Sequence, residues 1–127
     1  MSCFFDGLLA ELTDEELKVL EIKRSSPELI KILKLVNKPT PNVLWQGKFL
    51  KNKTMLDNLE HVKSYDAKTY KDGYLTSSAD PFMLLLCELF CWNITFKYNG
   101  SIINMRHRSP LRKCYFRASR THFERGR

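Results

Sequence analysis

Apolar residues in the first third of the chain recur at intervals of three and four, the spacing of one face of an α-helix. This pattern predicts a first helix over residues 4–12, directly after Cys3. Thr13 and Glu16 then have the capping-box form that begins a second helix. The same periodicity continues into a third segment, so the N-terminal part of the chain is expected to be helical.

Prolines mark the limits of the next elements. Ser26 before Pro27 predicts the N-cap of the third helix, which the Asn-Lys-Pro stretch at 37–39 ends. Residues 37–53 hold two prolines, a glycine and four lysines around a short apolar island, and they are interpreted as a connection. A short helix is expected over 54–62. Asp80-Pro81 is predicted to cap and start a core helix, whose apolar run is too short to cross a bilayer.

The C-terminal part changes from helical to alternating periodicity. Residues 94–98 and 101–105 alternate on either side of Asn99-Gly100, which is typical of a hairpin with a type I′ turn. Residues 112–118 predict a third strand. The fold class is therefore α+β, with a helical N-terminal half packed on a small, mostly antiparallel sheet formed by the C-terminal half, and one domain is expected over 1–127.

Charge adds one alternative function. The formal net charge is +7, and residues 106–127 hold eight Lys or Arg against a single acid, Glu124. A non-catalytic module could use this basic segment to contact RNA phosphates, with Tyr98, Tyr115 and Phe116 as stacking faces. Basic surfaces are also common on proteins that bind no nucleic acid.

The four cysteines do not predict a disulfide framework, because they are few for the length and no signal peptide is evident at the start. Cys87 and Cys91 are spaced for a metal on one helix face, but no second Cys/His pair completes four ligands, and Cys114 lies apart. Reduced thiols in the core are the better interpretation.

Cys3 has a different context. At a helix N-terminus its thiolate would be favoured by the helix dipole, and the free amides there could receive an oxyanion. His122 follows a predicted strand, and Glu124 would project to the same side and fix the imidazole tautomer. The alternative is ordinary packing of Cys3 beneath the aromatic pair that follows it. His61 and His107 are interpreted as solvated residues.

Three segments together resemble the ovarian tumour (OTU) family of cysteine proteases. They are Cys3-Phe-Phe-Asp-Gly-Leu-Leu9, the run from Gly73-Tyr74 through the apolar helix to Ile94-Thr-Phe96, and Tyr115-Phe116 leading to His122-Phe-Glu124. The resemblance spans nearly the whole chain, with the cysteine first and the histidine last. The small size is similar to the viral branch, in which such a domain belongs to a replicase polyprotein.

The resemblance implies a papain-like, OTU-like fold and a deubiquitinase or isopeptidase that removes ubiquitin or a ubiquitin-like protein, with a viral polyprotein as a further substrate. Cys3 would be the nucleophile, His122 the base and Glu124 its orienter, where the family more often has Asp or Asn. Met1-Ser2 stand in place of the Asp-Gly-Asn loop of the family. Either the backbone of Ser2 and Cys3 would form the oxyanion hole, or the site is incomplete and the chain is a ubiquitin-binding module without catalysis.

The resemblance also sets the remaining expectations. It implies no metal and no cofactor, a monomer, and a cytoplasmic location, which is the host cytoplasm if the protein is viral. Because the tail of ubiquitin is basic, carboxylates should line its channel, and the candidates are Asp6, Asp66, Asp72 and Asp80.

Overall fold

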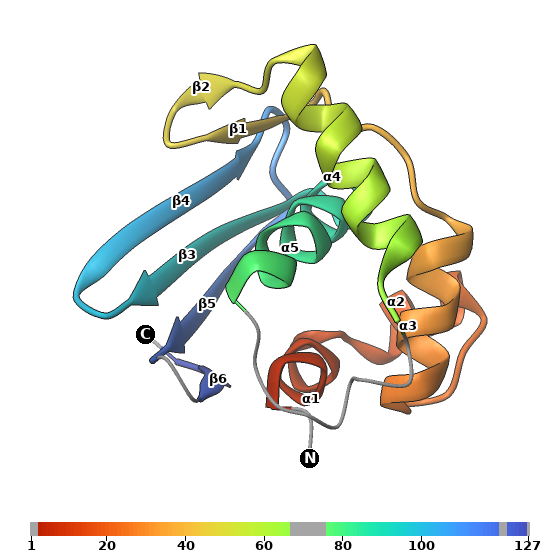
Figure 1. Cartoon of the computed structure of the whole chain (residues 1–127). Coiled ribbons are helices and arrows are strands. Elements are labelled where there is room, and N and C mark those ends of the chain that lie inside the picture. The colour runs from red at the N-terminus through yellow and green to blue at the C-terminus, as the bar shows by residue number, and fades with distance from the viewer. Residues whose placement is uncertain (1–2, 67–75, 120–121, 127) are drawn as a thin grey trace.

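The computed structural model describes residues 3–66, 76–119 and 122–126, with the side chains of residues 3 and 76–79 left out. The described chain is α+β, with helices packed against a six-stranded mixed sheet, as predicted at that level (Figure 1). The elements are α1 (Cys3–Glu11), α2 (Asp14–Leu20), α3 (Ser26–Leu35), β1 (Val43–Trp45), β2 (Lys48–Phe49), α4 (Asn52–Ser64), α5 (Thr76–Phe90), β3 (Trp92–Tyr98), β4 (Ser101–His107), β5 (Arg112–Ala118) and β6 (Phe123–Arg125).

The starts of the N-terminal helices follow local side-chain chemistry. The Thr13 hydroxyl accepts a hydrogen bond from the Glu16 amide, and the Glu16 carboxylate accepts one from the Thr13 amide. The predicted capping box at the start of α2 is therefore present. The predicted N-cap of α3 was one residue late. Ser25, with extended backbone, is the N-cap, and Ser26 is instead the first helical residue, where its hydroxyl donates to Asp6 at 2.7 Å. This bond ties α3 to α1.

The sheet has the order β2-β1-β4-β3-β5-β6. The predicted hairpin is confirmed: β3 and β4 pair antiparallel, and Asn99 and Gly100 both have positive φ. β5, also predicted, lies on the other side of β3 and pairs parallel to it, whereas the other neighbouring strands pair antiparallel. The connection from β4 to β5 passes the start of β3, where the Leu111 amide donates to the Cys91 carbonyl at 2.8 Å.

Residues 37–53, interpreted as a partly ordered connection, are more regular than expected. This segment contains the hairpin β1-β2, with Gln46 and Gly47 at positive φ in its two-residue turn, so two strands come from the first half of the chain. Buried Glu88 fixes the approach to the hairpin by accepting from the amide and the side chain of Asn42, at 2.9 and 2.7 Å. β1 then pairs with β4, which extends the sheet.

α5 provides the central core helix, and Figure 1 shows it running across the sheet with α4 on its outer side. The helix begins at Thr76 and contains Pro81 in its interior, so the prediction that Asp80-Pro81 starts it was wrong. Its residues Phe82 to Cys87 are almost completely buried. The predicted short helix is longer than expected and forms α4. In the described part of the chain, no helix combines the length and apolarity needed to cross a bilayer.

Candidate functional site

The start of the chain packs against its end. A side chain at Gly7 would bring its Cβ within 2.8 Å of the Phe123 ring and 3.9 Å of the Glu124 Cα, so the absence of a side chain there lets α1 approach β6. One turn later, Glu11 accepts from Arg125 at 2.8 Å. Figure 1 shows α1 beside the short strand β6. Gly7 was not predicted to have a role, although a glycine inside an apolar helical pattern is a sequence signal for such a contact.

Buried aromatic rings fix this contact. The Phe123 ring is 1% exposed and lies 4.8 Å from the Phe4 ring and 5.1 Å from the Phe116 ring, measured between centroids. Phe4 in turn packs edge-on to Phe5 at 4.9 Å. Because these aromatic side chains are at or near full burial, the position of β6 against α1 is set by the core rather than by a surface loop.

His122 and Glu124 lie on the same side of β6, as the alternation of an extended chain predicts. The distance from His122 Nε2 to Glu124 Oε2 is 3.4 Å, which is within reach of an ion pair or a long hydrogen bond. The other carboxylate oxygen, Oε1, accepts from Arg117 Nε at 2.6 Å. These bonds, from Arg117 first and His122 second, hold the pKa of Glu124 below its ordinary value, so the carboxylate is ionised.

Arg117 was missed by sequence analysis. It is the cross-strand partner of Glu124 in the β5-β6 pair, a register that the sequence does not reveal. The Ser119 amide donates to the His122 carbonyl at 2.8 Å and closes the turn before β6. Arg117, Ser119, His122 and Glu124 line an open depression of about 210 Å³ together with Ala118.

Cys3 is the first residue of α1. Its side chain, and Ser2 as a whole, lie outside the described part of the structure. The predicted contact of the Cys3 thiol with His122, and the oxyanion site expected at the backbone of Ser2 and Cys3, therefore stay predictions.

The other thiols have the character of core residues. Cys87 and Cys114 are buried, and burial raises the pKa of both well above the ordinary value of a cysteine. Both are therefore protonated at neutral pH and are poor nucleophiles. Cys91 is half-buried and has a left-handed backbone at the junction of α5 and β3. All three are free thiols, as predicted.

The other histidines lie elsewhere. His61 is exposed on α4, in agreement with its interpretation. His107 is not simply solvated, because it is half-buried in β4 and its Nδ1 accepts from the Ser109 amide at 2.9 Å. Among the described residues, no group of His, Cys, Asp and Glu side chains is arranged to hold a metal ion.

Much of the basic charge near the C-terminus is compensated by carboxylates. Arg112 donates to Glu11 at 2.8 Å and to Glu16 at 2.7 Å, and its guanidinium lies 4.7 Å from the centre of the Trp92 ring. Glu16 also accepts from Trp92 Nε1 at 2.7 Å. Burial opposes ionisation of Glu16, but the bonds from Arg112, the Thr13 amide and Trp92 outweigh it and lower its pKa. These contacts join the two N-terminal helices to the sheet.

The pairing leaves less free charge for RNA than the sequence predicts, because Arg112, Arg117 and Arg125 each have an acidic partner. One predicted stacking face is also wrong, since Phe116 is completely buried. Tyr98 and Tyr115 are half-buried.

The carboxylates expected to line a substrate channel come from different elements. Asp6 is exposed on α1, and Asp66 is exposed just after the end of α4. Asp80 is partly buried in α5. Asp72 lies outside the described residues.

Comparisons with known proteins identify no relative. No family model matches the chain, and neither the curated proteins nor the solved structures contain a match.

Proposed function

We propose that this protein is a thiol-dependent isopeptidase of the OTU type that removes ubiquitin or a ubiquitin-like protein from its conjugates. Cys3 transfers its proton to His122 and attacks the carbonyl carbon of the glycine-ended tail. The tetrahedral oxyanion collapses, the C–N bond breaks, and His122 protonates the leaving amine. Water activated by His122 then hydrolyses the thioester and restores the thiol.

The register of α1 against β6 is the observation that carries this proposal. Going along both elements in the same direction, Gly7 faces Phe123 and Glu124, and Glu11 reaches Arg125. Cys3 precedes Gly7 by one helical turn, about 6 Å, and two residues of a strand span nearly the same length. Extending this register backwards brings the start of α1 toward the chain just before Phe123, where His122 lies.

The surroundings of His122 support its role as a base. Glu124 is ionised and within 3.4 Å of the ring, so it can accept the imidazole N–H and stabilise the imidazolium that forms during attack. Arg117 holds the carboxylate from the other side. At the start of α1, the first amides of the helix have no intrahelical partners and are suited to bind an oxyanion beside Cys3.

The remaining features favour Cys3 and a slender substrate. Cys87 and Cys114 are buried and protonated, and Cys91 is half-buried after the end of α5, whereas Cys3 begins a helix, where the helix dipole favours a thiolate. The depression beside His122 has a volume of only about 210 Å³. A space of this size suits a tail that ends in glycine, because glycine adds no side chain. The same chemistry would cleave a polyprotein at a similar sequence.

The first test is capture of the nucleophile by a ubiquitin whose C-terminal carboxylate is replaced by a thiol-reactive electrophile, read by intact mass. We expect one adduct in the wild-type chain and none in Cys3→Ala. Cys91→Ala is the matched control, because Cys91 is half-buried whereas the other two described thiols, Cys87 and Cys114, are buried. This variant should retain the adduct.

His122→Ala should slow adduct formation by about 100-fold or more, since it removes the base. An adduct that persists in Cys3→Ala, or that disappears in Cys91→Ala, would place the nucleophile elsewhere. No adduct in a folded wild-type sample would contradict the proposed recognition of ubiquitin.

A further inference from the structure

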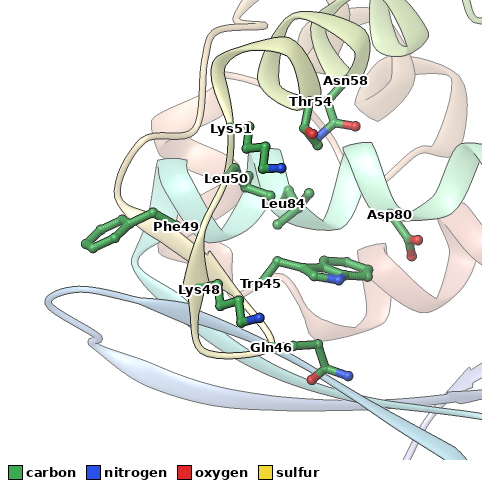
Figure 2. Close-up of a pocket in the computed structure, with 10 residues that line it drawn as sticks. All are labelled: Trp45, Gln46, Lys48, Phe49, Leu50, Lys51, Thr54, Asn58, Asp80 and Leu84. Carbon is green, nitrogen blue, oxygen red and sulfur yellow. The ribbon is translucent and has the colours of Figure 1, made fainter.

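A second and larger recess lies at the other edge of the sheet. It has a volume of about 730 Å³ and is enclosed by the β1-β2 hairpin, the start of α4 and one side of α5 (Figure 2). The depression beside His122 adjoins β6, at the opposite end of the strand order. The recess is therefore separate from the proposed catalytic site, and its function does not depend on that proposal. We call it the hairpin cleft.

Part of the wall of the hairpin cleft is apolar and includes a flat aromatic surface. Trp45 and Leu84 lie next to one another in Figure 2, with Leu50 above them. Trp45 and Leu50 are half-buried, so part of each remains open to a ligand. An indole ring offers a face on which a planar ring can stack.

Positive charge borders one side of the cleft. The side chains of Lys48 and Lys51 extend from the hairpin segment toward the side where Trp45 and Leu84 lie (Figure 2). Among the described residues, neither lysine has an ion-pair partner. This differs from the arginines near β6, which are paired with carboxylates.

The start of α4 adds to this positive potential. Lys51 is the N-cap of this 13-residue helix and provides no side-chain cap. The first intrahelical bond runs from the Met55 amide to the Lys51 carbonyl. The amides of residues 52–54 therefore precede the intrahelical ladder, and amides in this position favour an anion.

Polar groups without partners lie within the cleft. Asn58 Nδ2 is shielded from solvent and has no hydrogen-bond partner in the described part of the structure. Asp80 lies on the side of Trp45 away from Lys48 in Figure 2, and no described residue bonds to its carboxyl group. A shielded amide left unbonded costs about 1–3 kcal/mol, so the Asn58 side chain gains by turning its amide toward an acceptor on a ligand in the cleft.

We propose that the hairpin cleft binds a nucleoside monophosphate. Its base would stack on Trp45 and bond through its edge to Asn58 and Asp80, while its phosphate would meet Lys48, Lys51 and the first amides of α4. The volume lies within the range of small-molecule sites, about 300–1,000 Å³. A fatty acid would satisfy the lysines and the apolar wall, but it would leave the Asn58 amide unbonded.

The proposal is tested by calorimetric titration at fixed ionic strength with AMP, adenosine and inorganic phosphate. We expect saturable binding of AMP that is at least about tenfold tighter than binding of either part alone, because base and phosphate contacts act together. The chain has two tryptophans, and Trp92 is completely buried. AMP should therefore quench the tryptophan fluorescence of the wild-type protein. This quenching should be absent in Trp45→Phe.

Matched charge variants separate this site from general attraction to a protein of net charge +7. Lys48→Gln/Lys51→Gln should weaken AMP binding by about tenfold or more and leave adenosine unchanged. Lys18→Gln/Lys31→Gln removes the same charge from exposed positions on α2 and α3 and should leave AMP affinity within about twofold.

Equal weakening by both double variants would overturn the proposal, as would phosphate binding as tightly as AMP. No saturation with AMP up to about 10 mM, in a sample whose circular dichroism shows a folded protein, would also refute it. None of these outcomes bears on Cys3 or His122, so failure here leaves the isopeptidase proposal intact.

Discussion

The two edges of the sheet use charge in opposite ways. At the β5-β6 edge, Arg112, Arg117 and Arg125 all contact carboxylates of α1, α2 or β6. At the β1-β2 edge, Lys48 and Lys51 border a cleft, and no described acid pairs with them. The compensated edge fixes the position of α1 against β6, whereas the uncompensated edge keeps charge available for a ligand.

This contrast reconciles the net charge of +7 with the proposed site for the tail of ubiquitin, which is basic. Charge that is neutralised locally contributes little potential beyond a Debye length, about 8 Å at physiological salt. Arg117 and Arg125, which are paired with Glu124 and Glu11, therefore repel a cationic tail less than unpaired arginines would. Lys48 and Lys51, which have no described ion-pair partner, lie at the other edge.

The largest effect on stability is expected at Arg112, whose ion pairs are the least exposed at the β5-β6 edge. Arg112→Met should lower the free energy of unfolding by about 3 kcal/mol, because Glu16, whose side chain is only 13% exposed, would lose its cationic partner, and Glu11 would keep only Arg125. Urea unfolding measures this loss. Lys113→Met, an exposed cation on the same strand, should change stability by less than about 0.5 kcal/mol. Equal effects would show that the arginine contacts do not fix this edge.

The difference between the two edges also decides what the sequence could predict. The β3-β4 hairpin and the start of α2 depend on neighbouring residues, Asn99-Gly100 and Thr13 with Glu16, and both were predicted. The β1-β2 hairpin depends on β4, about sixty residues later, and on a Gln-Gly turn, and it was missed. Structure that depends on neighbouring residues can be predicted from one sequence, whereas strand pairing between distant segments cannot.

The candidate site divides in the same way. The common side of His122 and Glu124 follows from the alternation of an extended chain, so sequence analysis predicted it. Arg117 joins Glu124 only because of the β5-β6 register, and the hairpin cleft needs three elements brought together in space. Neither could be predicted from one sequence without the fold.

A second prediction concerns the contact between α1 and β6. Gly7→Ala should lower the free energy of unfolding by about 1–2 kcal/mol, since the new Cβ would meet the buried Phe123 ring at 2.8 Å. It should also slow capture by the ubiquitin electrophile, because α1 must move away from β6. Thermal unfolding and adduct formation measure the two effects.

A control variant on the same helix separates the effect of packing from the effect of helix propensity. Alanine is a better helix former than glycine by about 1 kcal/mol, so propensity alone would make Gly7→Ala stabilising. Ala10→Gly, at an exposed position of the same helix, should destabilise by about that amount without changing capture. A stabilised Gly7→Ala variant would contradict close packing of α1 on β6.

At the open edge, Asp80 should make stability depend on pH. Burial raises its pKa from 3.8 to about 6, so the folded state binds this proton more tightly than the unfolded chain. Its contribution to stability is present below about pH 4 and is lost as the pH rises to about 6. Asp80→Asn should therefore be more stable than wild type by about 1–2 kcal/mol at pH 7 and equal to it near pH 4. Urea unfolding at both pH values measures this, and a constant difference would exclude ionisation as the cause.

The smallest effect on stability, and the most specific effect on activity, is expected at Arg117. Its bond to Glu124 is exposed, with 56% of the arginine side chain accessible, so Arg117→Gln should leave the unfolding midpoint unchanged. Turnover of a ubiquitin substrate should fall by about three- to tenfold, because Glu124 would no longer be held beside His122.

The pH profile distinguishes this positioning role from a merely structural one. Arg117 is the main cause of the lowered pKa of Glu124, so its removal should raise that pKa toward the ordinary value. A protonated Glu124 cannot stabilise the imidazolium, and the acidic limb of kcat/KM should therefore move to higher pH in Arg117→Gln. Arg117→Lys should restore much of the wild-type profile, because it returns the positive charge. If turnover falls without a shift of the acidic limb, Arg117 acts on the strand geometry and not through the carboxylate, and the compensated edge is then only a structural support for α1.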